Sequence, residues 1–115
     1  MRIALDAMGS DRSPFTEVKG AVKASLADEQ LDIVLVGDQR AIEEELAKYP
    51  SRPNISIRHA SEVIRMDDSP AQGVRQKKDS SLLVGMRMVK KGEADAIVSA
   101  GNTGAVQVAA RIILG

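Results

Sequence analysis

Four short runs of aliphatic residues, separated by stretches with helical spacing, constrain the fold of this chain more than any other feature. The runs lie at residues 2–7, 31–38 and 55–60, and a fourth begins at residue 96. Residues 31–38 are mostly consecutive aliphatic and β-branched residues, which is typical of a strand covered on both faces. Strands that alternate with helices predict right-handed βαβ units. We therefore expect an α/β fold with a doubly wound, mostly parallel sheet and helices on both faces.

Capping residues predict where the helices begin and end. Asp38 is the expected N-cap of a helix after the second strand. Ser80 or Ser81 is the expected N-cap of a later helix, and Gly92 is expected to end that helix. The intervening residues 61–79 are irregular in pattern and are expected to hold one short helix. The first helix is expected to begin with Ser13 as N-cap and Pro14 at the first helical position, with an inner side made of Phe15, Val18, Val22 and Leu26.

Composition narrows the class of protein. The 115 residues form one expected α/β domain, residues 1–115, with 16 basic and 16 acidic residues. The balanced charge and only two aromatic residues argue against a nucleic-acid partner. The chain has no cysteine and no apolar stretch near the roughly 18 residues that a membrane span needs. We expect a soluble, cytoplasmic protein.

Residues 99–105, SAGNTGA, join a predicted strand to a predicted helix. The start of such a helix offers unpaired backbone N–H groups and a positive dipole end, which favour an anion such as phosphate. Gly101 and Gly104 are expected to allow a sharp turn and a close approach to a ligand, while Asn102 and Thr103 add an amide and a hydroxyl. The glycine spacing alone fits a ligand-free tight join equally well, and Asn102 also fits a turn.

Ligands of open parallel sheets bind beyond the carboxyl ends of the strands, so residues 6–11 and 99–104 are expected to share one site. Asp6 and Asp11 are candidates for orienting a donor or binding a metal, although an Asp beside a glycine loop is also a common turn or cap residue. The first strand is not followed by Gly-x-Gly-x-x-Gly, and no Walker pattern occurs. These absences argue against a dinucleotide-binding or nucleotide-hydrolysing domain.

A basic cluster lies in the least regular segment of the chain. Arg75, Lys77 and Lys78 offer positive charge that suits a phosphate or an acidic carrier protein. A solvated surface run explains the same residues without a ligand.

Three blocks in order carry a family resemblance: residues 3–11 (IALDAMGSD), 78–81 (KDSS) and 94–105 (ADAIVSAGNTGA). Together they resemble the bacterial phosphate acyltransferase family of phospholipid synthesis, and the similarity runs along the whole chain. It implies transfer of a fatty acyl group from acyl carrier protein to inorganic phosphate. The acyl phosphate would then be consumed by a membrane glycerol-3-phosphate acyltransferase. The resemblance also implies a fold similar to isocitrate and isopropylmalate dehydrogenases without their nicotinamide cofactor, and a homodimer that can touch the membrane.

Site residues are assigned here from position and chemistry. We expect catalytic roles for Asn102 and Asp6, with no metal and no cofactor. The expected phosphate- and substrate-binding residues are Gly9, Ser99, Gly101, Thr103, Gly104 and Lys78.

Two departures from the family pattern qualify these expectations. Ser10 stands where family members usually have a second glycine, which constrains the loop. Family chains are also much longer, so this chain corresponds to roughly the first third of one, a truncated fold whose activity on its own is left open. The alternative hypothesis is a non-catalytic α/β fragment or assembly module whose glycine loop is only structural.

Overall fold

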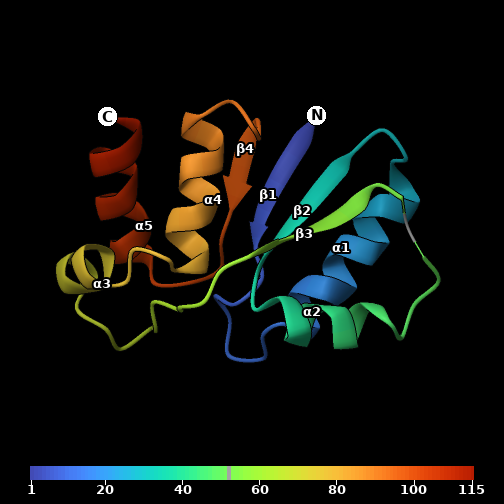
Figure 1. Ribbon diagram of the computed structural model, residues 1–115, viewed down its shortest axis with the longest axis horizontal. Coiled ribbons are helices and arrows are strands. Elements are labelled where there is room, and N and C mark those ends of the chain that lie inside the picture. Colours follow the sequence, from blue (N-terminus) through green and yellow to red (C-terminus); the bar gives the residue numbers. More distant parts are fainter. Residues whose placement is uncertain (52) are drawn as a thin grey trace.

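The computed structural model describes residues 1–51 and 53–115, and in them one sheet of four parallel strands forms the centre of the molecule (Figure 1). The strand order is β3-β2-β1-β4, with β3 and β4 at the edges. The strands are β1 (Arg2–Asp6), β2 (Asp32–Gly37), β3 (Ile55–His59) and β4 (Ala96–Val98). The α/β class and the parallel sheet are thus confirmed.

Helices cover both faces of this sheet, as expected of a doubly wound fold. Figure 1 shows α1 and α2 on one side and α4 and α5 on the other. The helices are α1 (Phe15–Ala27), α2 (Gln39–Leu46), α3 (Pro70–Gln76), α4 (Ser81–Lys90) and α5 (Thr103–Ala109), the last running into a π-helical turn at Ala110–Leu114.

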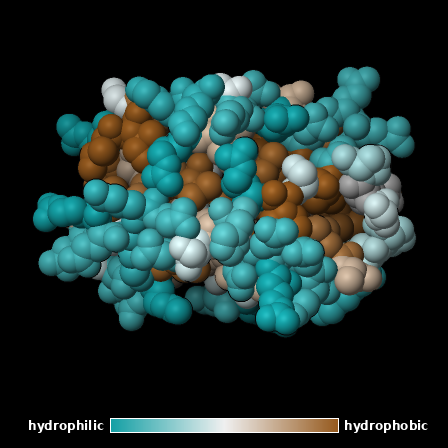
Figure 2. Space-filling view, viewed as in Figure 1, coloured by the Kyte–Doolittle hydropathy of each residue, from teal (hydrophilic) through white to brown (hydrophobic). Residues whose placement is uncertain are grey.

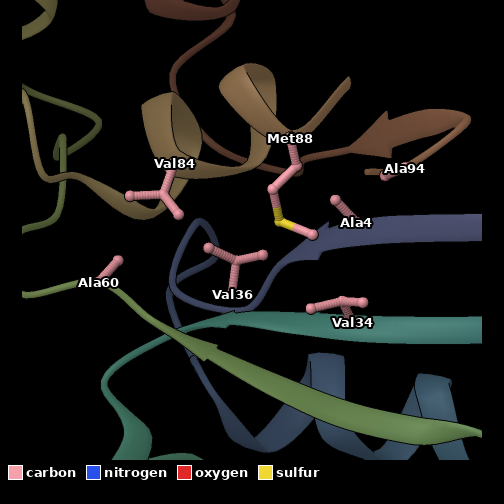
Figure 3. Packing of buried hydrophobic residues seen from close by; sticks show 7 residues of the cluster. All are labelled: Ala4, Val34, Val36, Ala60, Val84, Met88 and Ala94. Atoms are coloured by element: carbon pink, nitrogen blue, oxygen red, sulfur yellow. The ribbon is translucent and has the colours of Figure 1, made fainter. Parts of the chain in front are cut away.

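Alternate side chains of β2 supply the cores on the two faces. Ile33 and Leu35 pack with Val18 of α1 and Ile42 of α2. Their neighbours Val34 and Val36 point the other way, toward α4, where Met88 extends to Ala4 of β1 (Figure 3). Because successive strand residues face opposite sides, both faces of β2 must be apolar, and this produces the continuous aliphatic run in the sequence.

A third core cluster joins α3, α4 and α5 to the segment that precedes α3. Its buried residues are Ile64, Val74, Leu82, Leu83, Met86, Ala105 and Ala109. Ile64 is 6% exposed and lies in an irregular segment. Burying an aliphatic side chain of this size contributes about 1.5–3 kcal/mol, so Ile64 fixes that segment against the helices.

The expected caps are confirmed except at the first helix. The Asp38 carboxylate accepts from the Arg40 N–H, and the Ser80 hydroxyl accepts from the Leu83 N–H. Gly92, just after α4, has a φ of 77°, the left-handed conformation that ends helices.

The prediction for the start of α1 is wrong in detail. Pro14, not Ser13, is the N-cap, and the Ser13 hydroxyl donates to the Glu17 carboxylate instead. Val18 and Val22 are buried as expected, but Phe15 and Leu26 are 39% and 56% exposed. Apolar spacing alone overestimated how much of this helix the sheet covers.

Candidate functional site

The loops after β1 and β4 meet at the carboxyl edge of the sheet, the lower edge in Figure 1. β1 and β4 are neighbouring strands, but their following helices, α1 and α5, lie on opposite faces. The two loops therefore leave the sheet in opposite directions. Ligands of parallel sheets bind at such a switch point.

A chain of hydrogen bonds ties these two loops together. The Ser99 hydroxyl donates to Asp6 Oδ2 at 2.9 Å and accepts from the Gly101 N–H at 3.1 Å. The other carboxylate oxygen of Asp6 accepts from the Met8 N–H at 3.0 Å. Asp6 is 3% exposed, so its carboxylate is a buried acceptor shared by both loops.

Gly9 and Gly101 allow the two loops to touch. A Cβ on Gly9 would lie 2.8 Å from the backbone nitrogen of Gly101 and 3.1 Å from its Cα. Backbone atoms cannot give way as the end of a flexible side chain can, so a side chain at Gly9 would push the loops apart. Glycine is required here for close approach.

The chain bends at Gly101 as expected, although neither Gly101 nor Gly104 has a positive φ. Gly104 packs against Pro70, the first residue of α3, and this contact leaves no room for a side chain. A Cβ on Gly104 would lie 2.6 Å from the Pro70 Cγ. The neighbouring Thr103 is exposed at the start of α5. Gly104 thus joins α5 to α3, while Thr103 faces outward.

Asn102 links the glycine loop to the segment before α3. Its Oδ1 accepts from the Ala105 N–H at 3.1 Å, which caps α5. Its Nδ2 donates to the carbonyl oxygens of Arg65 and Asp68 at 3.1 and 3.0 Å. Both N–H bonds of this amide are used, and the residue is 9% exposed.

The segment that Asn102 holds, residues 63–68, is called here the 63–68 loop. Lys77 donates from Nζ to the Val63 carbonyl at 2.8 Å and to Asp68 Oδ2 at 2.6 Å. The same carboxylate oxygen accepts from the Arg65 N–H at 2.8 Å. The Lys77 hydrogen bond, followed by the Arg65 one, lowers the pKa of Asp68.

A cavity of about 360 Å³ separates this loop from the loop after β1. It lies beside Gly9, so one face of the β1 loop borders the cavity and the other borders Gly101. The lining residues are Met8, Gly9, Ser10, Asp11 and residues 63–67.

A second hydrogen-bonded cluster, formed by Ser10, Ser13 and Glu17, holds the β1 loop against the start of α1. The Glu17 carboxylate oxygen Oε2 accepts from the Ser13 hydroxyl at 2.6 Å and from the Ser10 N–H at 3.2 Å. The hydroxyls of Ser10 and Ser13 lie 3.0 Å apart. Ser10 is thereby built into the loop. Within the described part of the chain, the other Glu17 oxygen is buried with no hydrogen-bond partner.

Comparison with known proteins gives the family. The model of the family described as "Fatty acid synthesis protein" matches residues 1–115. The chain belongs to this family. It is 50% identical, over all 115 of its residues, to the phosphate acyltransferase of Moorella thermoacetica, of which it covers 34%. The phosphate acyltransferases of Desulfitobacterium hafniense (strain DSM 10664 / DCB-2) and Syntrophomonas wolfei are each 49% identical, with 34% and 36% of their lengths covered.

The chain therefore spans about a third of the length of these relatives. The resemblance on residues 3–11, 78–81 and 94–105 is confirmed by membership of the fatty acid synthesis protein family. In the described part of this family member, no helix has the length and apolar character needed to cross a membrane.

The structure brings some of the predicted site residues together and separates others. Asp6, Gly9, Ser99 and Gly101 lie within one connected set of contacts at the switch point, and Asn102, which follows Gly101 in the chain, holds the 63–68 loop. Lys78 is not part of this set. The hydrogen bonds that hold the 63–68 loop come from its neighbour Lys77. The Lys78 side chain is exposed, and its carbonyl accepts from Arg87.

Sequence reasoning missed the 63–68 loop and Glu17. The pattern of residues 61–79 showed only irregularity, and the pairing of Asn102 with carbonyls 34 and 37 residues away has no sequence signal. Glu17 had a usable signal, since an acidic residue in the first turn of a helix is favoured by the helix dipole.

Proposed function

We propose that the whole protein carrying this chain is a phosphate acyltransferase that moves a fatty acyl group from acyl carrier protein to inorganic phosphate. The observation that carries this proposal is the identity of about half of all residues, along the whole chain, to proteins named phosphate acyltransferase. The contact between the β1 and β4 loops supports it, because that contact builds the carboxyl-edge position where a parallel sheet binds its ligand.

In the proposed reaction an oxygen of phosphate attacks the carbonyl carbon of the carrier thioester. A C–O bond forms, the C–S bond breaks, and the carrier leaves as its thiolate, which takes up a proton from solvent. Phosphate is itself the nucleophile, so the protein contributes position and stabilisation of the developing oxyanion. No protein nucleophile and no cofactor enter this scheme.

The site residues have different roles in this proposal. The loop at residues 101–104 binds phosphate through the backbone N–H groups of residues 102–104 and the Thr103 hydroxyl, while the Gly101 N–H is held by Ser99. Asp6 and Ser99 hold the two loops in register through their hydrogen bonds. Asn102 acts by position, since both of its N–H bonds already hold the 63–68 loop. Exposed Lys78 attracts the acidic carrier.

We also propose the fold of the whole protein, its oligomeric state and location, and the enzyme that uses its product. The fold extends into one similar to isocitrate and isopropylmalate dehydrogenases, the protein works as a cytoplasmic homodimer that touches the membrane peripherally, and a membrane glycerol-3-phosphate acyltransferase consumes the acyl phosphate.

The test is formation of acyl phosphate by the whole protein. Purified protein is incubated with a long-chain acyl carrier protein and inorganic phosphate. Free carrier thiol is measured, and acyl phosphate is separated from the carrier before it is trapped with hydroxylamine as the hydroxamate, because hydroxylamine also cleaves thioesters. We expect hydroxamate that depends on both substrates and an equal amount of free carrier thiol. Thiol release without phosphate dependence would indicate a thioesterase and contradict the proposal.

A further inference from the structure

The cavity between the β1 loop and the 63–68 loop is not lined by the glycine loop, so it is a candidate for a separate subsite. We propose that it binds the phosphopantetheine arm on which the carrier presents its thioester, and that Arg65 recognises the phosphate of this arm. The inference rests on the proposed function and extends it to a second subsite. A volume of about 360 Å³ is within the range of small-molecule sites.

The wall that carries Arg65 is irregular in backbone yet firmly held. Ile64 is buried among the helices, Asn102 binds two carbonyls of the loop, and Lys77 binds a third. These anchors use backbone carbonyls and one apolar side chain. The side chains of Arg65 and Met66 stay exposed, the latter at 60%. Such a fixed loop with exposed side chains suits recognition, because little conformational freedom is lost on binding.

The lining matches a mostly uncharged chain with one anionic end. Met8, Val63 and Met66 offer apolar surface to the methylene and dimethyl groups of the arm. Arg65 is the only basic residue among the described residues that line the cavity, where it stands with Asp11 and Asp67. One guanidinium can bind the phosphate end of an arm whose remainder is neutral.

The position of Gly9 connects the two subsites. Gly9 lines the cavity, and its Cα approaches the Gly101 backbone on the other side. An arm that lies along the cavity with its phosphate at Arg65 can therefore direct its thioester toward the glycine loop. Phosphate bound at residues 101–104 would then meet the carbonyl carbon at the boundary between the loops.

The test compares two inhibitors on the whole protein: 4′-phosphopantetheine, which carries the recognised phosphate, and pantetheine, which lacks it. In the parent protein we expect 4′-phosphopantetheine to compete with the acyl carrier and to bind more tightly than pantetheine. Arg65→Gln should weaken 4′-phosphopantetheine about tenfold, to the level of pantetheine, and leave pantetheine and the KM for phosphate unchanged. Arg65→Lys should restore part of the difference.

Arg40→Gln is the matched control, because Arg40 is an exposed arginine at the start of α2. It should alter neither inhibitor. The inference is overturned if 4′-phosphopantetheine does not bind, if Arg65→Gln weakens both inhibitors equally, or if it raises the KM for phosphate instead. Inhibitor binding is also measured by calorimetry without turnover, so a protein that binds the arm but forms no acyl phosphate would contradict the proposed function alone.

Discussion

At the residue scale, the missing side chain of Gly9 decides how closely the two loops approach. We predict that Gly9→Ala in the whole protein lowers turnover at least tenfold, because the new Cβ would meet the Gly101 backbone at 2.8 Å and displace one loop from the other. Overpacking of this kind costs about 1–3 kcal/mol of stability. Turnover and the thermal midpoint are measured together.

Gly20→Ala is the control for this substitution. Gly20 is exposed within α1, and a Cβ there meets nothing within 4 Å. Alanine should leave turnover unchanged and stabilise the helix by about 0.5–1 kcal/mol. If Gly9→Ala behaves like Gly20→Ala, the close approach of the loops has no part in activity.

Asn102 has two separable functions, as cap of α5 and as donor to the 63–68 loop. We predict that Asn102→Ala lowers turnover at least tenfold without unfolding the protein. Asn102→Ser keeps an N-cap acceptor, worth about 1 kcal/mol, but cannot make both bonds to the Arg65 and Asp68 carbonyls. Serine should therefore recover stability and not turnover.

Gln107→Ala, an exposed change on the same helix, is the control for general effects on α5. Equal turnover in the parent and in both Asn102 variants would show that the link between the loops is dispensable. Full recovery of turnover by serine would assign the effect to helix capping.

At the scale of elements, the 63–68 loop is held partly by charge and should respond to acid. The pKa of Asp68 is lowered by the hydrogen bonds from Lys77 and Arg65. A carboxyl whose pKa is lower in the folded state contributes stability above its unfolded pKa and loses it as pH falls through the folded pKa. The contribution of Asp68 should thus be complete at neutral pH and disappear below about pH 4.

The measurement is an NMR titration of the Asp68 carboxyl carbon and the Arg65 amide. Both signals should shift together with a midpoint below the ordinary value of 3.8. In Asp68→Asn the Arg65 amide should not show this titration. A midpoint at or above the ordinary value would mean that the Lys77 ion pair does not form in solution.

The start of α5 tests the purely structural reading of the glycine loop. We predict that Gly104→Ala lowers stability by about 1–3 kcal/mol, since its Cβ would meet Pro70 at 2.6 Å. Phosphate affinity, measured by isothermal calorimetry on the whole protein, separates a packing role of Gly104 from a role in phosphate binding. If affinity falls by less than twofold, Gly104 serves only the packing of α5 on α3; a larger fall places it in phosphate binding.

Local signals in the sequence predicted most of the elements and few of the links between them. The aliphatic run at residues 31–38 and the caps Asp38 and Ser80 are short-range features, and each was found in place. The bonds from Asn102 to the 63–68 loop and from Ser99 to Asp6 join residues 34 to 93 positions apart. Periodicity cannot reveal such pairs, although the common position of strand carboxyl ends in a parallel sheet allowed the meeting of the β1 and β4 loops to be expected.

The same contrast explains the errors. Ser13 has the right residue type for an N-cap, but its hydroxyl is engaged with Glu17 and Ser10, so tertiary context determined its partner. Gly101 lies at the expected bend, but the smallness of Gly101 and Gly104 also serves contacts with Gly9 and Pro70. The residue type at each position indicated a local structural constraint, but only the neighbouring residues in the structure show which contact imposes it.

At the scale of the whole molecule, β4 pairs only with β1 among the residues that the structure describes, and its open edge lies beside an apolar groove. Val98 of β4 is 49% exposed in this groove. A second apolar area lies over α5, where Ile112 is 68% exposed, and hydrophobic residues gather both there and over the sheet and α1 in Figure 2. The groove is lined by Ile3, Leu5, Gly20, Ala21, Ala24, Leu31, Ile33 and Val98.

An open strand edge next to apolar surface favours pairing with another chain, so the 115-residue chain on its own should self-associate at micromolar concentrations. We predict that Val98→Lys shifts it toward monomer by at least tenfold in the association constant, because a charge would have to be buried in the groove. Sedimentation velocity over a range of concentrations measures this. Ile112→Lys separates the two surfaces: if it disperses the chain and Val98→Lys does not, association runs through α5, and the edge of β4 is not the exposed interface.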